Sequence, residues 1–124
     1  GGNETILLVD DEEFIRELGV DVLGRAGYTV LTASNGEDAL ELYQKERARI
    51  DLVILDLIMP GISGSKCLEE LLTINPDTRV LIASGYSPDG PTKGALDTGA
   101  KGFVSKPYDT SQLLQLVRKI LDRK

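Results

Sequence analysis

Four short apolar segments of the chain are each followed, within two residues, by side chains that could take part in chemistry. These side chains are three carboxylates, one hydroxyl and one ammonium group: Asp10, Asp11, Asp56, Ser84 and Lys106. Carboxylates that lie close together repel one another unless a cation joins them. Magnesium accepts one or two carboxylates together with phosphate oxygens, and an aspartate beside it can attack phosphorus. If the fold gathers these residues, they predict phosphoryl transfer to an aspartate, with the lysine and the hydroxyl stabilising the transferred group.

Each of these residues also has a structural interpretation. Asp10 and Asp11 could favour the start of a helix through capping and the helix dipole, and Asp56 could begin a turn. Ser84 could cap a helix, and Lys106 could be a solvated surface charge. Capping needs only one acid at a helix start, so it explains neither the second carboxylate nor an aspartate that directly ends an apolar segment. The five residues together therefore favour the chemical interpretation.

The apolar segments are short and rich in β-branched residues, and several are almost continuously apolar. Parallel strands covered on both faces have this pattern. The expected strands are Thr5–Val9, Tyr28–Ala33, Asp51–Leu55, Thr78–Ala83 and Gly102–Val104.

Segments with helical spacing lie between and after these strands. In the first, apolar residues recur every fourth position from Phe14 to Ala26, with Ile15 and Leu23 beside them. The second follows Ser34–Asn35–Gly36 and runs through Tyr43, and the third runs from about Gly64 to Ile74. A short, weakly specified helix is expected around Thr92–Thr98. The last helix should begin after Asp109, a favourable N-cap, with Gln112 as its capping-box partner.

Five strand–helix units predict an α/β fold, an open, doubly wound parallel sheet with right-handed crossovers. Ligands bind beyond the carboxyl ends of the strands in such sheets, which is where the five polar residues would meet. Residues 1–4 are expected to be a leader or linker, and residues 5–124 a single domain.

The composition disfavours several classes of function. The 124 residues carry a net charge of −6, which disfavours direct nucleic-acid binding. No apolar run approaches the roughly 20 residues needed to cross a bilayer, so no membrane contact is expected. The chain has no histidine, which excludes the commonest general base and zinc ligand. Its single cysteine, Cys67, is expected to be a small residue on a helix, and a reducing cytoplasm fits this composition.

Three motifs resemble the receiver domains of two-component response regulators. They are the stretches Ile6–Glu12 (ILLVDDE), Asp51–Gly61 (DLVILDLIMPG) and Gly102–Pro107 (GFVSKP), in the family's order and spacing. The resemblance extends from Glu4 to the last helix. It implies a flavodoxin-like, five-stranded sheet of order 2-1-3-4-5 with five helices, in a cytoplasmic signalling module.

The resemblance also implies roles for individual residues. Asp56 would be the phospho-acceptor, and Asp10 and Asp11 would form the acidic pocket for Mg2+, with Asp11 the preferred direct ligand. The carbonyl of Ile58 would be a further ligand. Lys106 would contact the phosphoryl group, and its bond to Pro107 would be cis.

Ser84 and Phe103 would form the switch that reads the phosphorylated state. Phosphorylation would draw Ser84 toward the phosphoryl group, and Phe103 would turn inward into the space released. The surface of the fourth helix, fifth strand and fifth helix would then rearrange, and a homodimer could form through it. The phosphoryl donor would be a phosphohistidine on a histidine kinase or a histidine phosphotransfer domain.

Some positions depart from the commonest family pattern. Gly85 replaces a frequent alanine, and the bulky Ile58 and Tyr86 occupy positions that flank the phosphoryl group. Their size predicts restricted access of water and a long-lived phosphoryl group. Ser84–Tyr86, the weak fourth helix and the leader resemble receivers found at the C-terminus of hybrid sensor kinases.

Two other functions remain open from the sequence. A pseudo-receiver, an unphosphorylated interaction module, should lack at least one of the acid pair, the acceptor or the lysine, but all are present. A small phosphatase with an aspartyl nucleophile usually carries a second aspartate two residues later, where this chain has Ile58.

Overall fold

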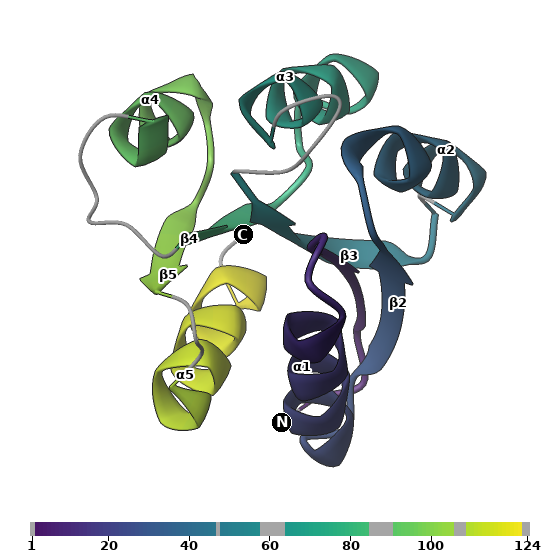
Figure 1. Ribbon diagram of the computed structural model, residues 1–124, viewed down its shortest axis with the longest axis vertical. Coiled ribbons are helices and arrows are strands. Elements are labelled where there is room, and N and C mark those ends of the chain that lie inside the picture. Colours follow the sequence, from purple (N-terminus) through teal and green to yellow (C-terminus); the bar gives the residue numbers. More distant parts are fainter. Residues whose placement is uncertain (1, 47, 58–63, 85–90, 106–108, 123–124) are drawn as a thin grey trace.

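The computed structural model describes residues 2–46, 48–57, 64–84, 91–105 and 109–122. Strands and helices alternate along the chain, as the sequence predicts (Figure 1). The strands are β1 (Thr5–Val9), β2 (Thr29–Ala33), β3 (Ile50–Asp56), β4 (Val80–Ser84) and β5 (Gly102–Ser105). The helices are α1 (Glu13–Arg25), α2 (Gly36–Glu46), α3 (Gly64–Ile74), α4 (Pro91–Thr98) and α5 (Thr110–Leu121).

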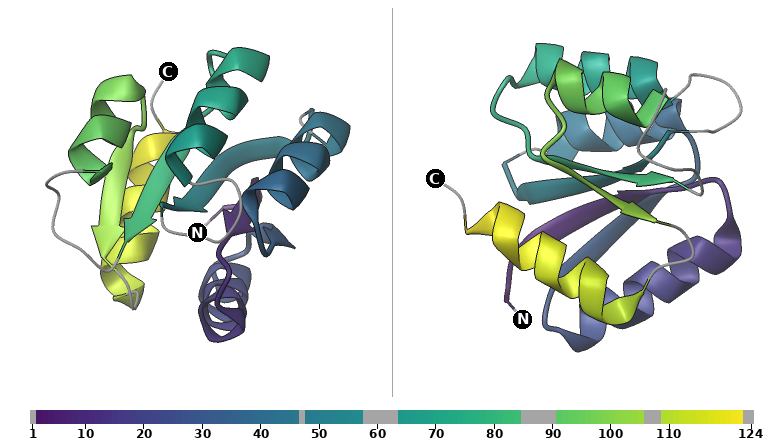
Figure 2. Two further views of the ribbon diagram at one scale, coloured as in Figure 1. Left: turned by 45° about the horizontal axis from the view of Figure 1, so that its top comes forward. Right: turned by 90° about the vertical axis from the view of Figure 1, so that its left-hand side faces the viewer.

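The five strands form one parallel sheet in the order β2-β1-β3-β4-β5, which confirms the predicted doubly wound, flavodoxin-like topology. Helices α1 and α5 cover one face of the sheet, and α2, α3 and α4 cover the other (Figures 1 and 2). The chain reverses its direction of winding after β2, so the carboxyl ends of the neighbouring strands β1 and β3 lie beside a topological switch point.

Two hydrophobic cores lie on the two faces of the sheet. Along β1, Ile6 and Leu8 belong to the core beneath α1 and α5, while Leu7 and Val9 belong to the core beneath α2, α3 and α4. All four side chains are 1% exposed or less. Burial on both faces explains why the strands read as continuous apolar segments rather than as alternating ones.

Helix α1 contradicts one expectation from the sequence. The buried side of this helix is formed by Ile15, Gly19, Val22 and Leu23, whereas Phe14 is 69% exposed. A helix has 3.6 residues per turn, so a strict four-residue repeat drifts around its surface and cannot stay on one face. The expectation that Phe14 begins the apolar face was therefore wrong.

Strand β4 begins two residues later than predicted, because Thr78 belongs to a turn. Its amide donates to the carbonyl of Asn75 at 3.0 Å, and its hydroxyl bonds the same carbonyl at 2.7 Å. The hydroxyl of Tyr43 lies 2.7 Å from that of Thr78 in a buried contact. The predicted bounds of α3 are confirmed, and Asp109 caps α5 by accepting from the Gln112 amide at 2.9 Å.

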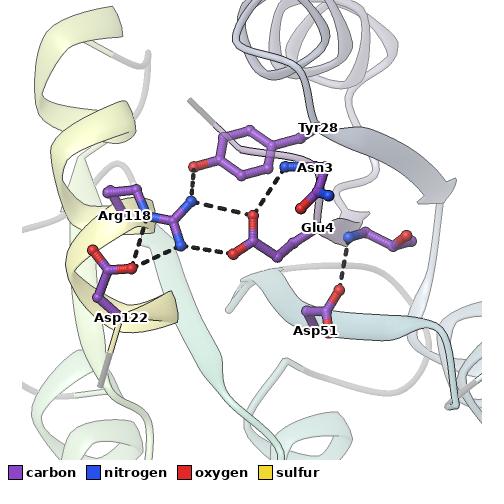
Figure 3. A network of polar contacts seen from close by, with 7 residues as sticks. Asn3, Glu4, Tyr28, Asp51, Arg118 and Asp122 are labelled. Carbon is purple, nitrogen blue, oxygen red and sulfur yellow. Dashed lines mark hydrogen bonds and ion pairs between the residues drawn. The ribbon is translucent and has the colours of Figure 1, made fainter. Parts of the chain in front are cut away.

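An ion-pair network joins the residues before β1 to α5 (Figure 3). It lies at the amino-terminal ends of the strands, opposite their carboxyl ends. The guanidinium of Arg118 donates to both carboxylate oxygens of Glu4, at 2.6 and 3.1 Å. It also donates to Asp122 at 2.8 Å and to the hydroxyl of Tyr28 at 3.3 Å. The hydrogen bond from Arg118 lowers the pKa of Glu4 below its ordinary value of 4.5.

In the described part of the chain, no helix has the length and apolar character needed to cross a membrane.

Candidate functional site

Three carboxylates meet at the carboxyl ends of β1 and β3. Asp10 and Asp11 follow β1, Asp56 is the last residue of β3, and the two strands are paired up to Val9 and Leu55. One carboxylate oxygen from each aspartate lies within 4.8 Å of the other two. Asp10 is 0% exposed and Asp56 3% exposed, whereas Asp11 faces solvent. The structure therefore brings together the three acidic residues singled out from the sequence.

Hydrogen bonds hold Asp10 at three points. Its amide donates to the carbonyl of Ala33 on β2 at 3.1 Å, and its carboxylate accepts from the Glu12 amide at 2.9 Å. The guanidinium of Arg16 on α1 donates to its carbonyl at 2.8 Å. The N-cap position of α1 is occupied by Glu12, whose side chain makes no capping bond. Asp10 is thus fixed at the end of a strand, and the helix-capping interpretation of this residue does not hold.

Asp56 is fixed by the strand that it ends and by the first residue of α3. It pairs with Ala83 of β4, and the Leu57 amide donates to the Ala83 carbonyl at 3.4 Å. The Gly64 amide donates to the Leu57 carbonyl at 3.0 Å. A Cβ atom on Gly64 would lie 2.3 Å from the Asp56 carbonyl oxygen, so only glycine allows this approach. The backbone of Asp56 is therefore held in β3 and packed closely against Gly64, while the turn through Pro60–Gly61 considered from the sequence lies outside the described residues.

Of the other candidates, the structure places the backbone of Ser84 at the carboxyl end of the same sheet. Ser84 ends β4 and pairs with Ser105, which ends β5 immediately before Lys106 in the sequence. Ile58, Lys106, Pro107 and the side chain of Ser84 lie outside the described residues. The positions proposed for the magnesium-binding carbonyl and for the phosphoryl-binding lysine and hydroxyl thus remain predictions.

Phe103 lies on β5 opposite Ile82 of β4. Its side chain is half-buried and packs against the core formed with α2, α3 and α4. Since β5 is an edge strand, this ring lies between the core and the surface near α4. Its position is compatible with a role in a switch between two side-chain positions.

The donor set suits a hard divalent cation. All three side chains offer oxygen, and two of them are almost completely buried, where unbalanced negative charge is costly. Magnesium favours oxygen ligands and usually keeps several waters, which the exposed Asp11 side would admit. The cluster therefore fits Mg2+ by its chemistry.

Two residues that support this site, Arg16 and Gly64, were not identified from the sequence. Arg16 reaches back from the first turn of α1 to a main-chain carbonyl, and sequence carries no signal for such a contact. Gly64 looked like an ordinary helix start. The sequence does place a glycine shortly after the aspartate that ends a strand. Glycine at such a position allows two segments of backbone to approach closely, and this was the available signal.

Comparison with known proteins gives matches over nearly the whole chain. The family model of the response regulator receiver domain matches residues 6–118. Sporulation initiation phosphotransferase F of Bacillus subtilis is 36% identical over 122 residues, which cover 98% of this chain and 97% of that protein. The sensor kinase CckA of Brucella abortus is 35% identical, again over 98% of this chain, but the chain spans only 13% of that kinase.

Solved structures with the same fold are also similar in sequence. A chain in the CheX–CheY–BeF3–Mg2+ complex from Borrelia burgdorferi superposes with a TM-score of 0.92 at 30% identity, covering 97% of this chain and 90% of that one. A response regulator receiver domain protein from Clostridium thermocellum gives a TM-score of 0.91 at 31% identity, covering 97% and 95% of the two chains.

Proposed function

Because this chain belongs to the response regulator receiver domain family, we propose that Asp56 accepts a phosphoryl group within a two-component phosphorelay. The observation that carries the proposal is the cluster of Asp10, Asp11 and Asp56, whose carboxylates lie within 4.8 Å of one another at the end of a parallel sheet. Receiver domains are signalling modules rather than enzymes of metabolism, so the chemistry is limited to gain and loss of this phosphoryl group.

The proposed reaction transfers the phosphoryl group from a histidine of a partner protein. An oxygen of the Asp56 carboxylate attacks phosphorus, a P–O bond forms, the P–N bond breaks, and the imidazole leaves with the bonding electrons. Strand pairing and close packing hold the main chain of Asp56 at the end of β3, which limits the positions open to its carboxylate and so lowers the entropic part of the barrier. Little other covalent chemistry is required of the protein, since phosphoryl transfer depends mainly on positioning and electrostatic stabilisation.

Asp10, Asp11, Asp56 and the Ile58 carbonyl would hold the magnesium ion. When bound, Mg2+ supplies positive charge that offsets the carboxylates and the phosphoryl oxygens. The similar chain from Borrelia burgdorferi belongs to a complex with BeF3 and Mg2+, which supports this assignment. Lys106 would donate to the phosphoryl group from the end of β5.

Ser84 and Phe103 would convert the added charge into a change of surface. Phosphorylation replaces the single negative charge of the carboxylate by about two on the phosphoryl group, and it adds strong acceptor oxygens at one point. Ser84 would move toward them, and Phe103, half-buried on the edge strand β5, would turn inward. The surface of α4, β5 and α5 would then bind a partner or a second copy of the chain.

The donor would be a histidine kinase or a histidine phosphotransfer domain, in the cytoplasm. Similarity to a sporulation phosphotransferase and to part of a sensor kinase supports a place in such a relay. We also propose that the chain is the receiver of a hybrid sensor kinase, which its similarity to part of the kinase CckA supports. The alternative is a stand-alone regulator, which its similarity to nearly all of sporulation initiation phosphotransferase F supports.

Phosphorylation by a small donor tests the function directly. The chain is treated with acetyl phosphate, with Mg2+ or with a chelator, and its intact mass is measured. We expect a gain of one phosphoryl group that requires Mg2+ and is lost in Asp56→Asn. Asp51→Asn is the matched control, because Asp51 lies at the opposite end of β3, where it accepts from the Thr5 amide at 2.9 Å.

Other results would identify the alternatives. Absence of modification in the folded wild-type chain would indicate a pseudo-receiver. Rapid, repeated turnover of the donor without a stable product would indicate an aspartyl phosphatase. Modification that persists in Asp56→Asn would show that another residue is the acceptor.

A further inference from the structure

We propose that Arg16 is a positioning residue for the magnesium site, acting through the main chain of Asp10. The inference rests on the proposed function, since it assumes that the three aspartates bind Mg2+. It adds a residue from α1 that none of the motifs contains.

The contact is a direct hydrogen bond between a side chain and the backbone of a buried residue. The guanidinium of Arg16 lies 2.8 Å from the Asp10 carbonyl oxygen, and its side chain is itself half-buried. The Arg16 amide donates to the Glu12 carbonyl at 3.0 Å, so its backbone is fixed in the first turn of α1. Arg16 therefore connects the helix to the loop residues that carry the carboxylates.

The hydrogen bonds of Asp10 act together to set the direction of its carboxylate. The bond to Ala33 fixes the amide of the residue, and the bond from Arg16 fixes its carbonyl. The peptide planes on both sides of Asp10 are thus held, and the Glu12 amide orients the carboxylate itself. Because partners that orient metal ligands typically affect metal affinity about 10- to 100-fold, loss of Arg16 should weaken magnesium binding measurably.

The charge of Arg16 predicts the opposite effect. A guanidinium beside three carboxylates repels an incoming divalent cation, so removal of the charge alone should strengthen Mg2+ binding. Loss of orientation should weaken it. The sign of the change in affinity therefore distinguishes a positioning residue from a merely neighbouring charge.

Titration of the chain with MgCl2, in the absence of a phosphodonor, tests the inference. Amide NMR signals of Asp11 and Glu12 report the dissociation constant for the wild type, Arg16→Gln and Arg16→Lys. We expect affinity to fall by about tenfold in Arg16→Gln. Arg16→Lys should lie between Arg16→Gln and the wild type, because its ammonium can still donate to the Asp10 carbonyl but lacks the planar fork of donors.

A second readout follows the loop without any metal. Hydrogen exchange of the Glu12 amide should accelerate in Arg16→Gln, because its acceptor, the Asp10 carboxylate, is no longer held in place. Arg25→Gln is the matched control on the same helix: Arg25 is 81% exposed and pairs only with a neighbouring residue of α1, Asp21, in the contacts described. It should leave both readouts unchanged.

The possible outcomes distinguish failure of the proposed role of Arg16 from failure of the proposed magnesium site. Unchanged or tighter Mg2+ binding in both Arg16 variants, beside a wild type that binds Mg2+, would overturn the role of Arg16 alone. A folded wild type without any response to MgCl2 would overturn the magnesium site and the role of Arg16 with it. Thermal unfolding of each variant establishes that the titrations are made on folded protein.

Discussion

Replacement of Gly64 by alanine should damage phosphorylation although residue 64 carries no reactive group. An added Cβ would lie 2.3 Å from the Asp56 carbonyl oxygen and 2.4 Å from the Leu57 Cα, whereas ordinary contacts begin at 3.4 Å. Both atoms belong to the main chain, so no side chain can rotate away. The backbone of Asp56 and the start of α3 must separate by about 1 Å to accept the methyl group.

A displacement of that size has two measurable consequences. Overpacking of this kind typically costs about 1–3 kcal/mol of folding free energy. A misplacement of about 1 Å can reduce a reaction rate by about 100-fold. We therefore expect Gly64→Ala to remain folded with reduced stability, and to accept the phosphoryl group from acetyl phosphate about 100 times more slowly. Urea unfolding measures the first quantity and time-resolved intact mass the second.

Gly24→Ala is the control for adding a methyl group to a helical glycine. Apart from the neighbouring backbone of its own helix, no heavy atom would lie within 4 Å of its Cβ, so this variant should keep the wild-type rate. It should also gain up to about 1 kcal/mol, because alanine is the better helix former. If Gly64→Ala were phosphorylated at the wild-type rate with undiminished stability, the close packing around Asp56 would have no functional role and the reasoning would fail.

Three further predictions concern stability and reactivity away from the site. Arg118 lowers the pKa of Glu4 below 4.5, so this pair stabilises the fold above that pH and less as the pH falls through the folded-state pKa. Urea unfolding from neutral to acidic pH should therefore show a shallower loss of stability in Glu4→Gln than in the wild type, and parallel curves would contradict it. Asp109→Ala should lose about 1 kcal/mol in the same assay at neutral pH, since it removes the 2.9 Å capping bond from Gln112, and an unchanged midpoint would refute the cap. Burial raises the pKa of the Cys67 thiol to about 12, so a thiol reagent should label it only after unfolding, and rapid labelling of the native chain would contradict its burial.

The sheet could be predicted because its physical causes are local in the sequence. Strands covered on both faces must be almost continuously apolar, as Thr5–Val9 is, and Asp10 and Asp56 directly follow such segments. The carboxyl ends of parallel strands all lie at the same end of the sheet. The convergence of these carboxylates therefore followed from the strand assignments alone.

Other features depend on contacts that sequence patterns do not encode. The outward position of Phe14 reflects how α1 is rotated on the sheet, and the four-residue apolar spacing predicted that rotation wrongly. The late start of β4 depends on a turn that Thr78 makes with Asn75 and on its contact with Tyr43, which is distant in the sequence. The bond from Arg16 to a main-chain carbonyl depends on the path of the loop, and no residue pattern specifies that path.

The central claim is that Asp56, rather than another carboxylate of the cluster, receives the phosphoryl group. Borohydride reduces an acyl phosphate to an alcohol, so trapping after treatment with acetyl phosphate and Mg2+, followed by peptide mapping, identifies the modified residue. We expect residue 56 to be reduced, and Asp10 and Asp11, whose carboxylates lie within 4.8 Å, to remain intact. Reduction at Asp10 or Asp11, or no reduction in a folded chain, would contradict it.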